Sequence, residues 1–426
     1  MHSPDRRQFL QSSTLATVAT LAPWMFNAVS ADESAERDLS VGVIGTGRGM
    51  AHANAALNAK GVKLNYVCDV DRKRLELAMK TVEGRGAKPQ GITDFRRMLD
   101  DPKLDAVFIA TCNHWHAPAT ILACSAGKHV YVEKPGSHNA REGELMVQAA
   151  KKNRRIVQMG NQRRTWPGIQ EAIAKLKDGV IGKVLFARCW YDANRGSIGK
   201  GKAVPVPETL DYSMWQGPAP ERPYVDNLIH YNWHWRWHWG GGELANNGIH
   251  SLDVARWGLG VDCPTQVSFL GGRYHFEDDQ ETPDTGVAVF NFGDKGCSWE
   301  VSSCLPRKEE KHSLVMFYGT EGTLHVVDTG YRVYSPKGEE TANVSGGRGG
   351  EQDHIQNFLN SIRTGEKPNS EIEEGQKSTL LCHLGNISYQ LGRILRIDPE
   401  THRIIADKDA DALWTREYRP GWEPTV

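Results

Sequence analysis

Apolar and polar positions follow two patterns along the chain, and the change between them divides the sequence near residue 160. In the first part, short apolar runs rich in β-branched residues alternate with stretches whose apolar residues recur at helical spacing. Buried strands separated by helices predict a parallel sheet built from βαβ units. The strands are predicted over residues 39–44, 62–68, 105–110, 128–132 and 156–159, and the helices over residues 72–82, 117–126 and 140–153.

The second part consists of longer segments in which apolar and polar residues alternate one by one. Such segments, joined by short turns, predict a large, mostly antiparallel open sheet that is half solvated or half buried in an interface. Helices are predicted over residues 167–177, 352–363 and 373–395. The strands are predicted near residues 184–191, 265–274, 285–292, 296–303, 313–318, 322–327 and 331–334.

A glycine turn follows the first predicted strand. Gly45 and Gly47 allow backbone N–H groups at a helix N-terminus to approach a pyrophosphate, and Arg48 and Gly49 continue the turn. The third glycine of the G-x-G-x-x-G pattern would stand at position 50, which is Met50. Either Gly49 shifts the turn, or the alanine after Met50 provides the close helix packing.

Asp69 ends the second predicted strand, where a carboxylate can accept from both ribose hydroxyls. Because such a carboxylate repels a 2′-phosphate, the predicted cofactor is NAD, with NADP disfavoured. Helix N-capping is the alternative role for Asp69 or Asp71. The order of these features, a strand, a glycine turn, a second strand and an acidic residue, predicts an α/β protein. Its Rossmann dinucleotide-binding domain would span residues 38–160, and a second α/β domain residues 161–426.

The segment over residues 105–135 is a strand, loop, helix and strand that ends in Glu133, Lys134 and Pro135. Ligands of parallel sheets bind beyond the carboxyl ends of the strands, so residues 111–116 and 133–135 should lie side by side. A lysine held there can lose part of its preference for the charged form, as proton transfer requires. A surface Lys-Pro turn is the alternative. Further candidate cofactor contacts in these loops and the next are Thr111, Asn113, His114, His116, Glu133 and Gln162.

Aromatic and basic residues alternate over residues 233–239. In a strand, this alternation would place the tryptophans on one face and His234, Arg236 and His238 on the other, which suits stacking on a sugar ring. A packing or subunit-contact strip is the alternative. No nearby carboxylate or cysteine completes a ligand set with these histidines, so no metal site is predicted.

A second constellation follows three glycines at positions 240–242. Asn246, His250 and Asp253 fall at i, i+4 and i+7 on a predicted helix and form one polar stripe. An imidazole in the first turns of a helix that faces a cleft is a candidate acid or base. The candidate substrate contacts are Arg163, Arg164, Tyr191, His230, Trp233, His234, Asn246 and His250.

Composition narrows the class of partner. The 426 residues include 51 Lys+Arg and 52 Asp+Glu, so no net charge favours a nucleic acid or an anionic membrane. The eight cysteines form no C-x-x-C pair, which argues against a disulfide framework or a zinc site. The predicted partner is therefore a small molecule.

The first 31 residues are predicted to be a signal peptide. Arg6 and Arg7, followed by Phe9 and Leu10, have the twin-arginine pattern, and a mildly apolar stretch and small residues at 28–31 come next. That stretch is too interrupted by polar residues for a stable membrane span. We therefore expect export by the twin-arginine route and a periplasmic location.

Taken in order, these motifs resemble the Gfo/Idh/MocA oxidoreductases, named for glucose-fructose oxidoreductase and inositol dehydrogenase. The resemblance extends from residue 39 to the end, and its most specific part is A-G-K-H-V at residues 126–130 running into Glu133-Lys134-Pro135. It implies NAD(P) on the Rossmann domain and chemistry at a ring carbon of a sugar or cyclitol. It also implies an open sheet that forms subunit contacts, and hence a homo-oligomer, either a dimer or a tetramer.

By position, the family's lysine is Lys134 and its helix histidine is His250. The family's aspartate four residues earlier corresponds to Asn246, whose amide cannot accept a proton. The expected activity is oxidation of a ring hydroxyl of a sugar, cyclitol or glycoside by tightly bound nicotinamide, with Lys134 and His250 handling the proton. The alternatives are a redox-neutral NAD-dependent glycosidase or lyase, and a non-catalytic carbohydrate-binding protein of the same fold.

Overall fold

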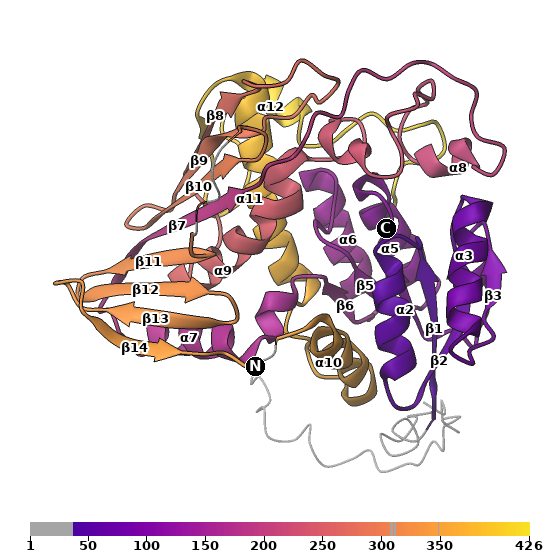
Figure 1. Ribbon diagram of the computed structural model, residues 1–426, viewed down its shortest axis with the longest axis horizontal. Coiled ribbons are helices and arrows are strands. Elements are labelled where there is room, and N and C mark those ends of the chain that lie inside the picture. Colours follow the sequence, from indigo (N-terminus) through magenta and orange to yellow (C-terminus); the bar gives the residue numbers. More distant parts are fainter. Residues whose placement is uncertain (1–36, 307–309, 311, 348) are drawn as a thin grey trace, which may run out of the picture.

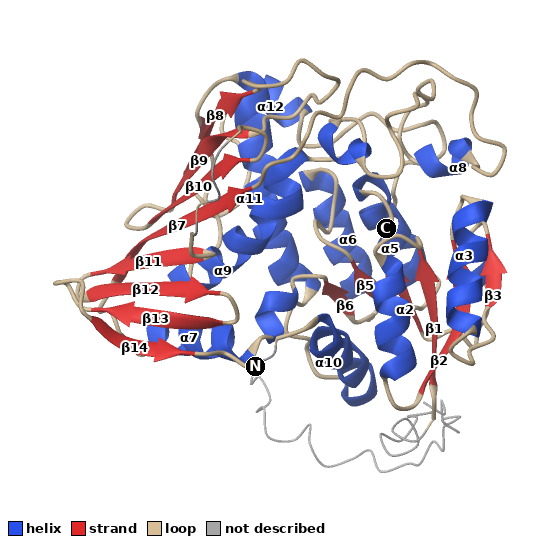
Figure 2. Cartoon of the chain, viewed as in Figure 1, coloured by secondary structure: helices blue, strands red, loops and turns tan. Residues whose placement is uncertain are grey.

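The computed structural model describes residues 37–306, 310, 312–347 and 349–426. Two sheets lie on opposite sides of the molecule, with a layer of helices between them (Figures 1 and 2). The predicted signal peptide lies outside the described residues. Within the described part of the chain, no helix is both long and apolar enough to cross a membrane.

The first sheet has six parallel strands in the order β3-β2-β1-β4-β5-β6. Every residue of β1 and β4 is buried, which explains why both are continuous apolar runs. The strand order reverses between β1 and β4, and a crevice for a ligand opens at the carboxyl ends of such a pair. The strands are β1 (Leu39–Ile44), β2 (Val62–Cys68), β3 (Gln90–Ile92), β4 (Ala106–Ile109), β5 (His129–Val132) and β6 (Val157–Met159).

Helices cover both faces of this sheet, and side-chain caps start two of them. Asp71 accepts a hydrogen bond from Lys73 N at the start of α3, and Asn139 accepts one from Glu142 N at the start of α6. The helices are α2 (Gly49–Asn58), α3 (Arg72–Glu83), α4 (Arg96–Leu99), α5 (Asn113–Ser125) and α6 (Ala140–Lys152).

One further helix on this sheet comes from late in the chain. In α10 (Glu351–Thr364), Phe358 packs edge-on against Phe108 of β4, with ring centroids 5.8 Å apart. The predicted division into residues 38–160 and 161–426 stays a prediction, and α10 packs across it.

The second sheet has nine strands in the order β14-β13-β12-β11-β7-β10-β9-β8-β15, and only the β7–β10 pair is parallel. The predicted fold class, a Rossmann domain followed by an α/β domain with a mostly antiparallel open sheet, is therefore confirmed. The strands are β7 (Val184–Asp192), β8 (Gln266–Gly272), β9 (Thr285–Asn291), β10 (Gly296–Ser302), β11 (Val315–Gly319), β12 (Gly322–Val327), β13 (Gly330–Tyr334), β14 (Glu340–Val344) and β15 (Leu395–Arg396).

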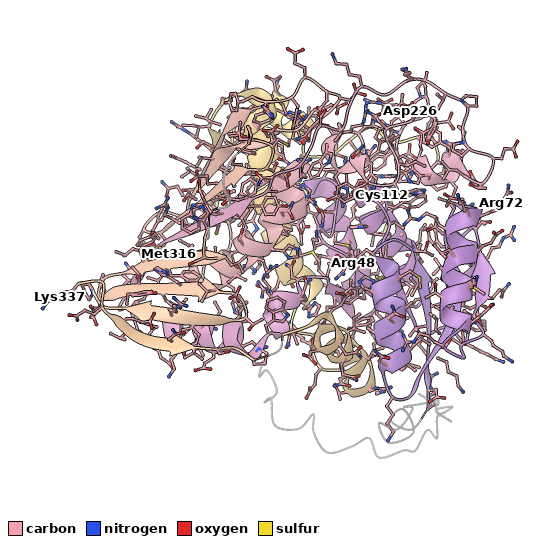
Figure 3. All side chains as sticks on the ribbon, viewed as in Figure 1. Arg48, Arg72, Cys112, Asp226, Met316 and Lys337 are labelled. Carbon is pink, nitrogen blue, oxygen red and sulfur yellow. The ribbon has the colours of Figure 1, made fainter. Side chains whose placement is uncertain are left out.

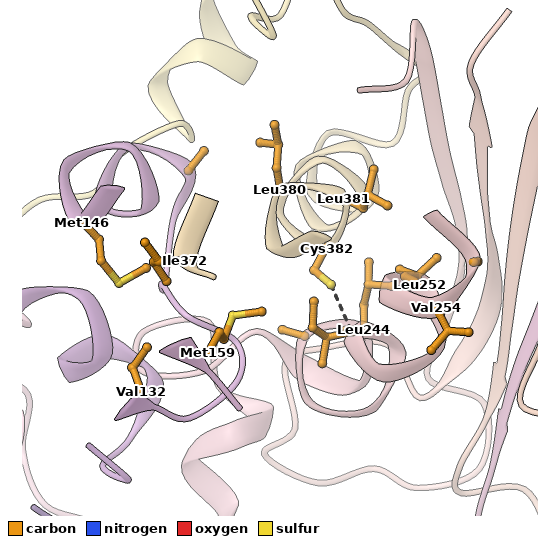
Figure 4. Close-up of a cluster of buried hydrophobic side chains, with 14 of the residues drawn as sticks. Val132, Met146, Met159, Leu244, Leu252, Val254, Ile372, Leu380, Leu381 and Cys382 are labelled. Carbon is orange, nitrogen blue, oxygen red and sulfur yellow. Dashed lines mark hydrogen bonds between the residues drawn. The ribbon is translucent and has the colours of Figure 1, made fainter. Parts of the chain in front are cut away.

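The helices α7 (Pro167–Lys177), α9 (Ile249–Leu259) and α11 (Ile372–Leu391) cover one face of this sheet, and α12 (Lys408–Ala412) lies near its β8 edge (Figure 1). Figure 4 shows the core between the two domains, where Leu252 of α9, Leu381 of α11 and Met159 of β6 belong to one buried cluster. Because this core is continuous, the two domains hold each other in a fixed arrangement.

The strand-like alternation over residues 233–239 does not correspond to a strand in the structure. Residues Asn232–Trp235 form a 3₁₀ helix within the long connection between β7 and the π-helical turn Leu244–Gly248. Trp233, Trp235 and Trp239 are buried, so the apolar positions do alternate. Among the described residues, this segment pairs with no strand. The indoles of Trp233 and Trp239 pack instead into a cluster formed largely by the connection itself. The connection also contains the short helix α8 (Tyr212–Gln216).

Candidate active site

A cavity of about 710 Å³ lies at the carboxyl ends of β1, β2, β4 and β5, and the second domain closes its other side. In Figure 3, Arg48 and Cys112, which both line it, are labelled near the middle of the view, whereas Lys337 is labelled at its edge. The predicted site residues that line the cavity are Gly45, Gly47, Arg48, Asp69, Thr111, Asn113, His116, Glu133, Lys134, Gln162, His230, Trp233, His234, Asn246 and His250.

The glycine turn forms the floor of the cavity. Gly45 has a φ of +87°, and a Cβ built on it would lie 2.5 Å from Ala110 O, so only glycine fits there. A Cβ on Gly49 would lie 2.8 Å from the Val43 side chain. Gly49 therefore provides the close packing of α2 on β1 and does not line the cavity.

Asp69 is fixed beside this turn. Its Oδ2 accepts from Thr46 N (2.9 Å) and Thr46 Oγ1 (2.6 Å), and its Oδ1 accepts from Asp71 N (3.0 Å). Asp71, and not Asp69, caps α3, and the ribose contact of Asp69 stays a prediction. Exposed backbone at a glycine turn beside a fixed carboxylate fits the pyrophosphate and ribose of a dinucleotide.

Lys134 faces the cavity from the end of β5. Its Nζ donates to Asn246 O (2.7 Å) and to Asn246 Oδ1 (3.1 Å). Burial lowers the pKa of the Lys134 ammonium below its usual value, the carboxylate of Glu133 opposes that shift, and Arg48 adds to it. Lys134 is therefore more easily deprotonated than a surface lysine, as a proton acceptor must be.

His250 lies opposite Lys134 in the wall from the second domain. Burial, together with the charges of Arg163 and Lys134, holds the pKa of His250 well below its usual value, so its imidazole is neutral. Its Nδ1 is buried and has no hydrogen-bond partner in the described part of the protein.

The predicted polar stripe is only partly correct. Asn246 lies in a π-helical turn (Leu244–Gly248) that precedes α9, so α-helical phasing does not run unbroken from Asn246 to Asp253. Asn246 and His250 line the cavity, whereas Asp253 accepts from Arg164 Nε (2.9 Å) and from Ser378 Oγ (2.6 Å). Asp253 thus anchors α9 to other elements.

Four other residues that were predicted to contact the cofactor or the substrate do not line the cavity. Arg164 is held by Asp253, and Tyr191 lies on β7. The ring of His114 contacts Trp215 O at 2.8 Å, and burial lowers the pKa of His114 to about 3. The guanidinium of Arg163 lies 5.3 Å from the Trp166 ring centroid, and burial lowers the pKa of Arg163 to about 10.

The connection between β7 and the π-helical turn closes the cavity. The backbone of this connection forms two hydrogen bonds with the turn after β2. Asp211 N donates to Val70 O, and Arg72 N donates to Thr209 O, both at 2.9 Å. His230 Nε2 lies 3.1 Å from Asp71 Oδ2. His230 was predicted to contact substrate, but this contact places it beside Asp69, the predicted ribose ligand.

Aromatic rings of this connection line the remaining wall. The rings of Trp233 and His234 are stacked with centroids 3.6 Å apart, and Tyr231 lies 4.7 Å from His234. Burial lowers the pKa of His234 to about 3, so this wall carries no charge there. Sequence analysis missed Tyr231, Met214, Trp215 and Arg74, which also line the cavity. The connection has no periodicity that would have indicated the first three.

Comparison with known proteins places this geometry in a family. Residues 39–161 match the Gfo/Idh/MocA description "Oxidoreductase family, NAD-binding Rossmann fold", and residues 189–424 match "Oxidoreductase family, C-terminal alpha/beta domain".

The chain belongs to the Gfo/Idh/MocA oxidoreductase family. The suspected family membership is thereby confirmed, as is an NAD-binding domain, while the preference for NAD over NADP stays a prediction. Among the family's curated members, the chain is 23% identical over 381 residues to the myo-inositol 2-dehydrogenase of Thermotoga maritima, covering 84% of this chain and 99% of that one.

Two further proteins are similar to this chain. The chain is 26% identical over 213 residues to a glycosyl hydrolase family 109 protein of Shewanella baltica, covering 45% of this chain and 46% of that one. The WlbA dehydrogenase of Bordetella pertussis, solved with NADH and UDP-GlcNAcA, has the same fold. Its TM-score is 0.67 at 20% identity, over 85% of this chain and 99% of that one.

Proposed function

We propose that the protein is an NAD-dependent dehydrogenase that oxidises a ring hydroxyl of a sugar, cyclitol or glycoside. The observation that carries this proposal is the shared cavity: Lys134 and a neutral His250 face the same space as the glycine turn and Asp69. A secondary alcohol can be oxidised where a proton acceptor and a hydride acceptor meet at one carbon. The names of the inositol dehydrogenase relative and of the WlbA dehydrogenase support the substrate class.

In this proposal, the backbone at Gly45 and Gly47 holds the pyrophosphate, and Asp69 accepts from the ribose hydroxyls. Bound NAD would supply the hydride acceptor. Lys134 takes the proton of the substrate hydroxyl, and Asn246 orients its Nζ through the two hydrogen bonds described above. His250, which also lines the cavity, holds or receives a proton on the facing side. An amide at position 246 cannot relay the proton, which leaves proton transfer to Lys134 and His250.

We also infer that the cofactor stays bound between turnovers. The connection is hydrogen-bonded across the turn after β2 at Val70 and Arg72, beside Asp69. A nucleotide enclosed in this way leaves only when those contacts open. Retention suits the proposed periplasmic location, for which the twin arginines Arg6 and Arg7 are the support, because folded proteins carry their cofactors through that route.

A homo-oligomer remains part of the proposal. The face of the nine-stranded sheet that the helices leave uncovered carries the exposed side chains of Leu270 (70% exposed), Val287 (41%) and Val289 (40%), and Leu270 pairs directly with Val287. Neighbouring apolar side chains on one open sheet face favour burial against a second subunit.

The test is to purify the mature protein and identify any retained nucleotide by mass spectrometry. Nicotinamide absorbance is then followed against a panel of sugars, cyclitols and glycosides. Retained NAD and reduction with at least one carbohydrate are the expected results. A protein that binds carbohydrates of the panel without any change in the nicotinamide would be a carbohydrate-binding protein, and the proposal would fail.

A redox-neutral glycosidase is the second candidate, and the match to a glycosyl hydrolase family 109 protein favours it. In that reaction, oxidation, elimination and re-reduction would cleave a glycosidic bond without net change in the cofactor. An aryl glycoside separates the two reactions. Net reduced nicotinamide supports the dehydrogenase, and released aglycone without net reduction supports the glycosidase.

A further inference from the structure

A cluster of charged side chains lies behind the glycine turn, next to the cavity. His52 on α2 is fully buried, Glu133 at the end of β5 is 6% exposed, and Glu351 comes from the first turn of α10. Arg48 is half-exposed and faces the cavity. Three segments that are distant in sequence therefore bring two carboxylates, an imidazole and a guanidinium together.

The contacts in this cluster converge on the two carboxylates. His52 Nε2 lies 3.0 Å from Glu133 Oε1 and 3.0 Å from Glu351 Oε1. Arg48 Nε donates to Glu133 Oε1 (3.2 Å), and Arg48 Nη2 lies 2.5 Å from Glu351 Oε2. The four groups balance in charge only when the imidazole is protonated. His52, Glu133 and Glu351 lie close enough together to hold a metal ion. Because the guanidinium of Arg48 already lies against both carboxylates, we assign no metal site.

Burial alone favours a neutral imidazole, yet the bonds and charges of Glu133 and Glu351 outweigh it and raise the pKa of His52. The same partners lower the pKa of Glu133 although its burial raises it. Of the other side chains around His52, the ring of Tyr131 lies 4.9 Å away, and burial raises the pKa of that phenol. His354, 5.7 Å from Tyr131, has its pKa lowered by burial to about 4. Both therefore stay neutral, and His52 carries the only titratable positive charge of the cluster.

Glu133 connects this cluster to Lys134. Its Oε2 accepts from Lys134 N at 3.1 Å, and its charge favours the ammonium form of Lys134. The charges of Arg48 and Arg163, which lie near Lys134, oppose that effect. The imidazole of His250 is neutral. Burial raises the pKa of the Cys382 thiol, so this thiol stays protonated. How strongly Glu133 stabilises the ammonium depends on how far His52 and Arg48 neutralise Glu133.

On the basis of the proposed function, we propose that His52 is a positioning residue whose positive charge neutralises Glu133 and thereby keeps Lys134 able to accept a proton. His52 does not line the cavity, so it acts on Lys134 through its effect on the charges of Glu133 and Glu351. Without its charge, the carboxylates of Glu133 and Glu351 share only Arg48, and the net negative charge beside Lys134 favours the ammonium.

The experiment is the pH dependence of kcat for His52→Gln in the NAD-loaded enzyme. Gln can still donate to Glu133 but carries no charge. The base form of Lys134 is the active one in oxidation, so kcat rises with pH as Lys134 loses its proton. In His52→Gln, this rising limb of the plot of kcat against pH should move to higher pH by about one unit. The rate should be about tenfold lower at pH values below the limb and recover at high pH. An equal loss at every pH, with no shift, would show a merely structural role.

Two further variants test the inference besides His52→Gln alone. The double change His52→Gln with Glu351→Gln removes one positive and one negative charge, so the limb should return toward its wild-type position. A double variant with the limb still displaced would overturn the inference. The matched control is His138→Gln. His138 is a partly buried histidine whose pKa burial holds well below its usual value, so its loss removes no charge. That control should leave the limb in place.

A second readout does not need substrate. The rate at which acetic anhydride acylates Lys134 is measured against pH by mass spectrometry, and it should show the same shift in His52→Gln. If the wild type oxidises no carbohydrate but the acylation profile shifts, the proposed function fails and this inference stands. If carbohydrate is oxidised and neither profile shifts, the inference fails and the proposed function stands.

Discussion

The two walls of the cavity are built in different ways. The wall formed by the parallel sheet consists of strand ends, a glycine turn and Asp69, and backbone hydrogen bonds fix it to the register of the strands. The wall formed by the connection before α9 consists of aromatic rings that pack on one another, with few regular backbone bonds. The first wall can hardly change without disrupting the sheet, whereas the second can change one side chain at a time. We therefore expect the first to hold the constant cofactor and the second to select the substrate.

The largest effect is expected from Gly45→Ala in the sheet wall. A Cβ there would lie 2.5 Å from Ala110 O, so the turn must shift, and nucleotide affinity should fall at least about tenfold. The measurement is retained nucleotide per chain after gel filtration, with thermal unfolding as a check of folding. Gly86→Ala is the control, because Gly86 has a similar φ of +85° but nothing within 4 Å of an added Cβ. Equal nucleotide retention in the two variants would contradict the account of the turn.

Asp69→Ser should act on cofactor choice within the same wall. Loss of a carboxylate that accepts from ribose hydroxyls should lower the preference for NAD over NADP by about tenfold to a hundredfold. The ratio of the two dissociation constants, measured by fluorescence titration, gives the answer. Asp71→Ser removes a carboxylate two residues away that caps α3, and it should leave the ratio unchanged. Wild-type protein that co-purifies with NADP would show that Asp69 has been misassigned.

A smaller and different effect is expected from the aromatic wall. Tyr231 is 55% exposed and lines the cavity, so Tyr231→Ala should raise KM for the carbohydrate several-fold while nucleotide retention stays the same. Tyr274→Ala is the control, since Tyr274 is 66% exposed and lies outside the cavity lining. A loss of nucleotide in Tyr231→Ala, with KM unchanged, would reverse the division of roles between the walls.

The sheet wall is also the part that could be predicted from sequence. Buried strands of a parallel sheet are continuous apolar runs, and their carboxyl ends meet at one edge, so Asp69 and Lys134 could be placed together without coordinates. Helix α5 begins at Asn113, earlier than predicted, because three of the first four residues are polar and Trp115 alone gives no helical spacing.

The aromatic wall could not be predicted, for a physical reason. The alternation at residues 233–239 has the period of a strand, but a strand also needs a partner, and here packing of the indoles replaces one. The contact of His230 with Asp71 joins residues 159 positions apart, and no local pattern records it. The π-helical turn at Asn246 likewise departs from the spacing on which the predicted stripe was based.

The central claim is that the two walls meet at a proton acceptor, Lys134, and its removal tests that claim most directly. Turnover of Lys134→Ala is measured with the carbohydrate that the wild type oxidises, after equal nucleotide content of the two proteins has been confirmed by mass spectrometry. Loss of a proton-transfer group of this kind costs about a hundredfold to ten-thousandfold in rate. We predict a loss of kcat in that range with the nucleotide retained. Turnover within about twofold of wild type would contradict the account.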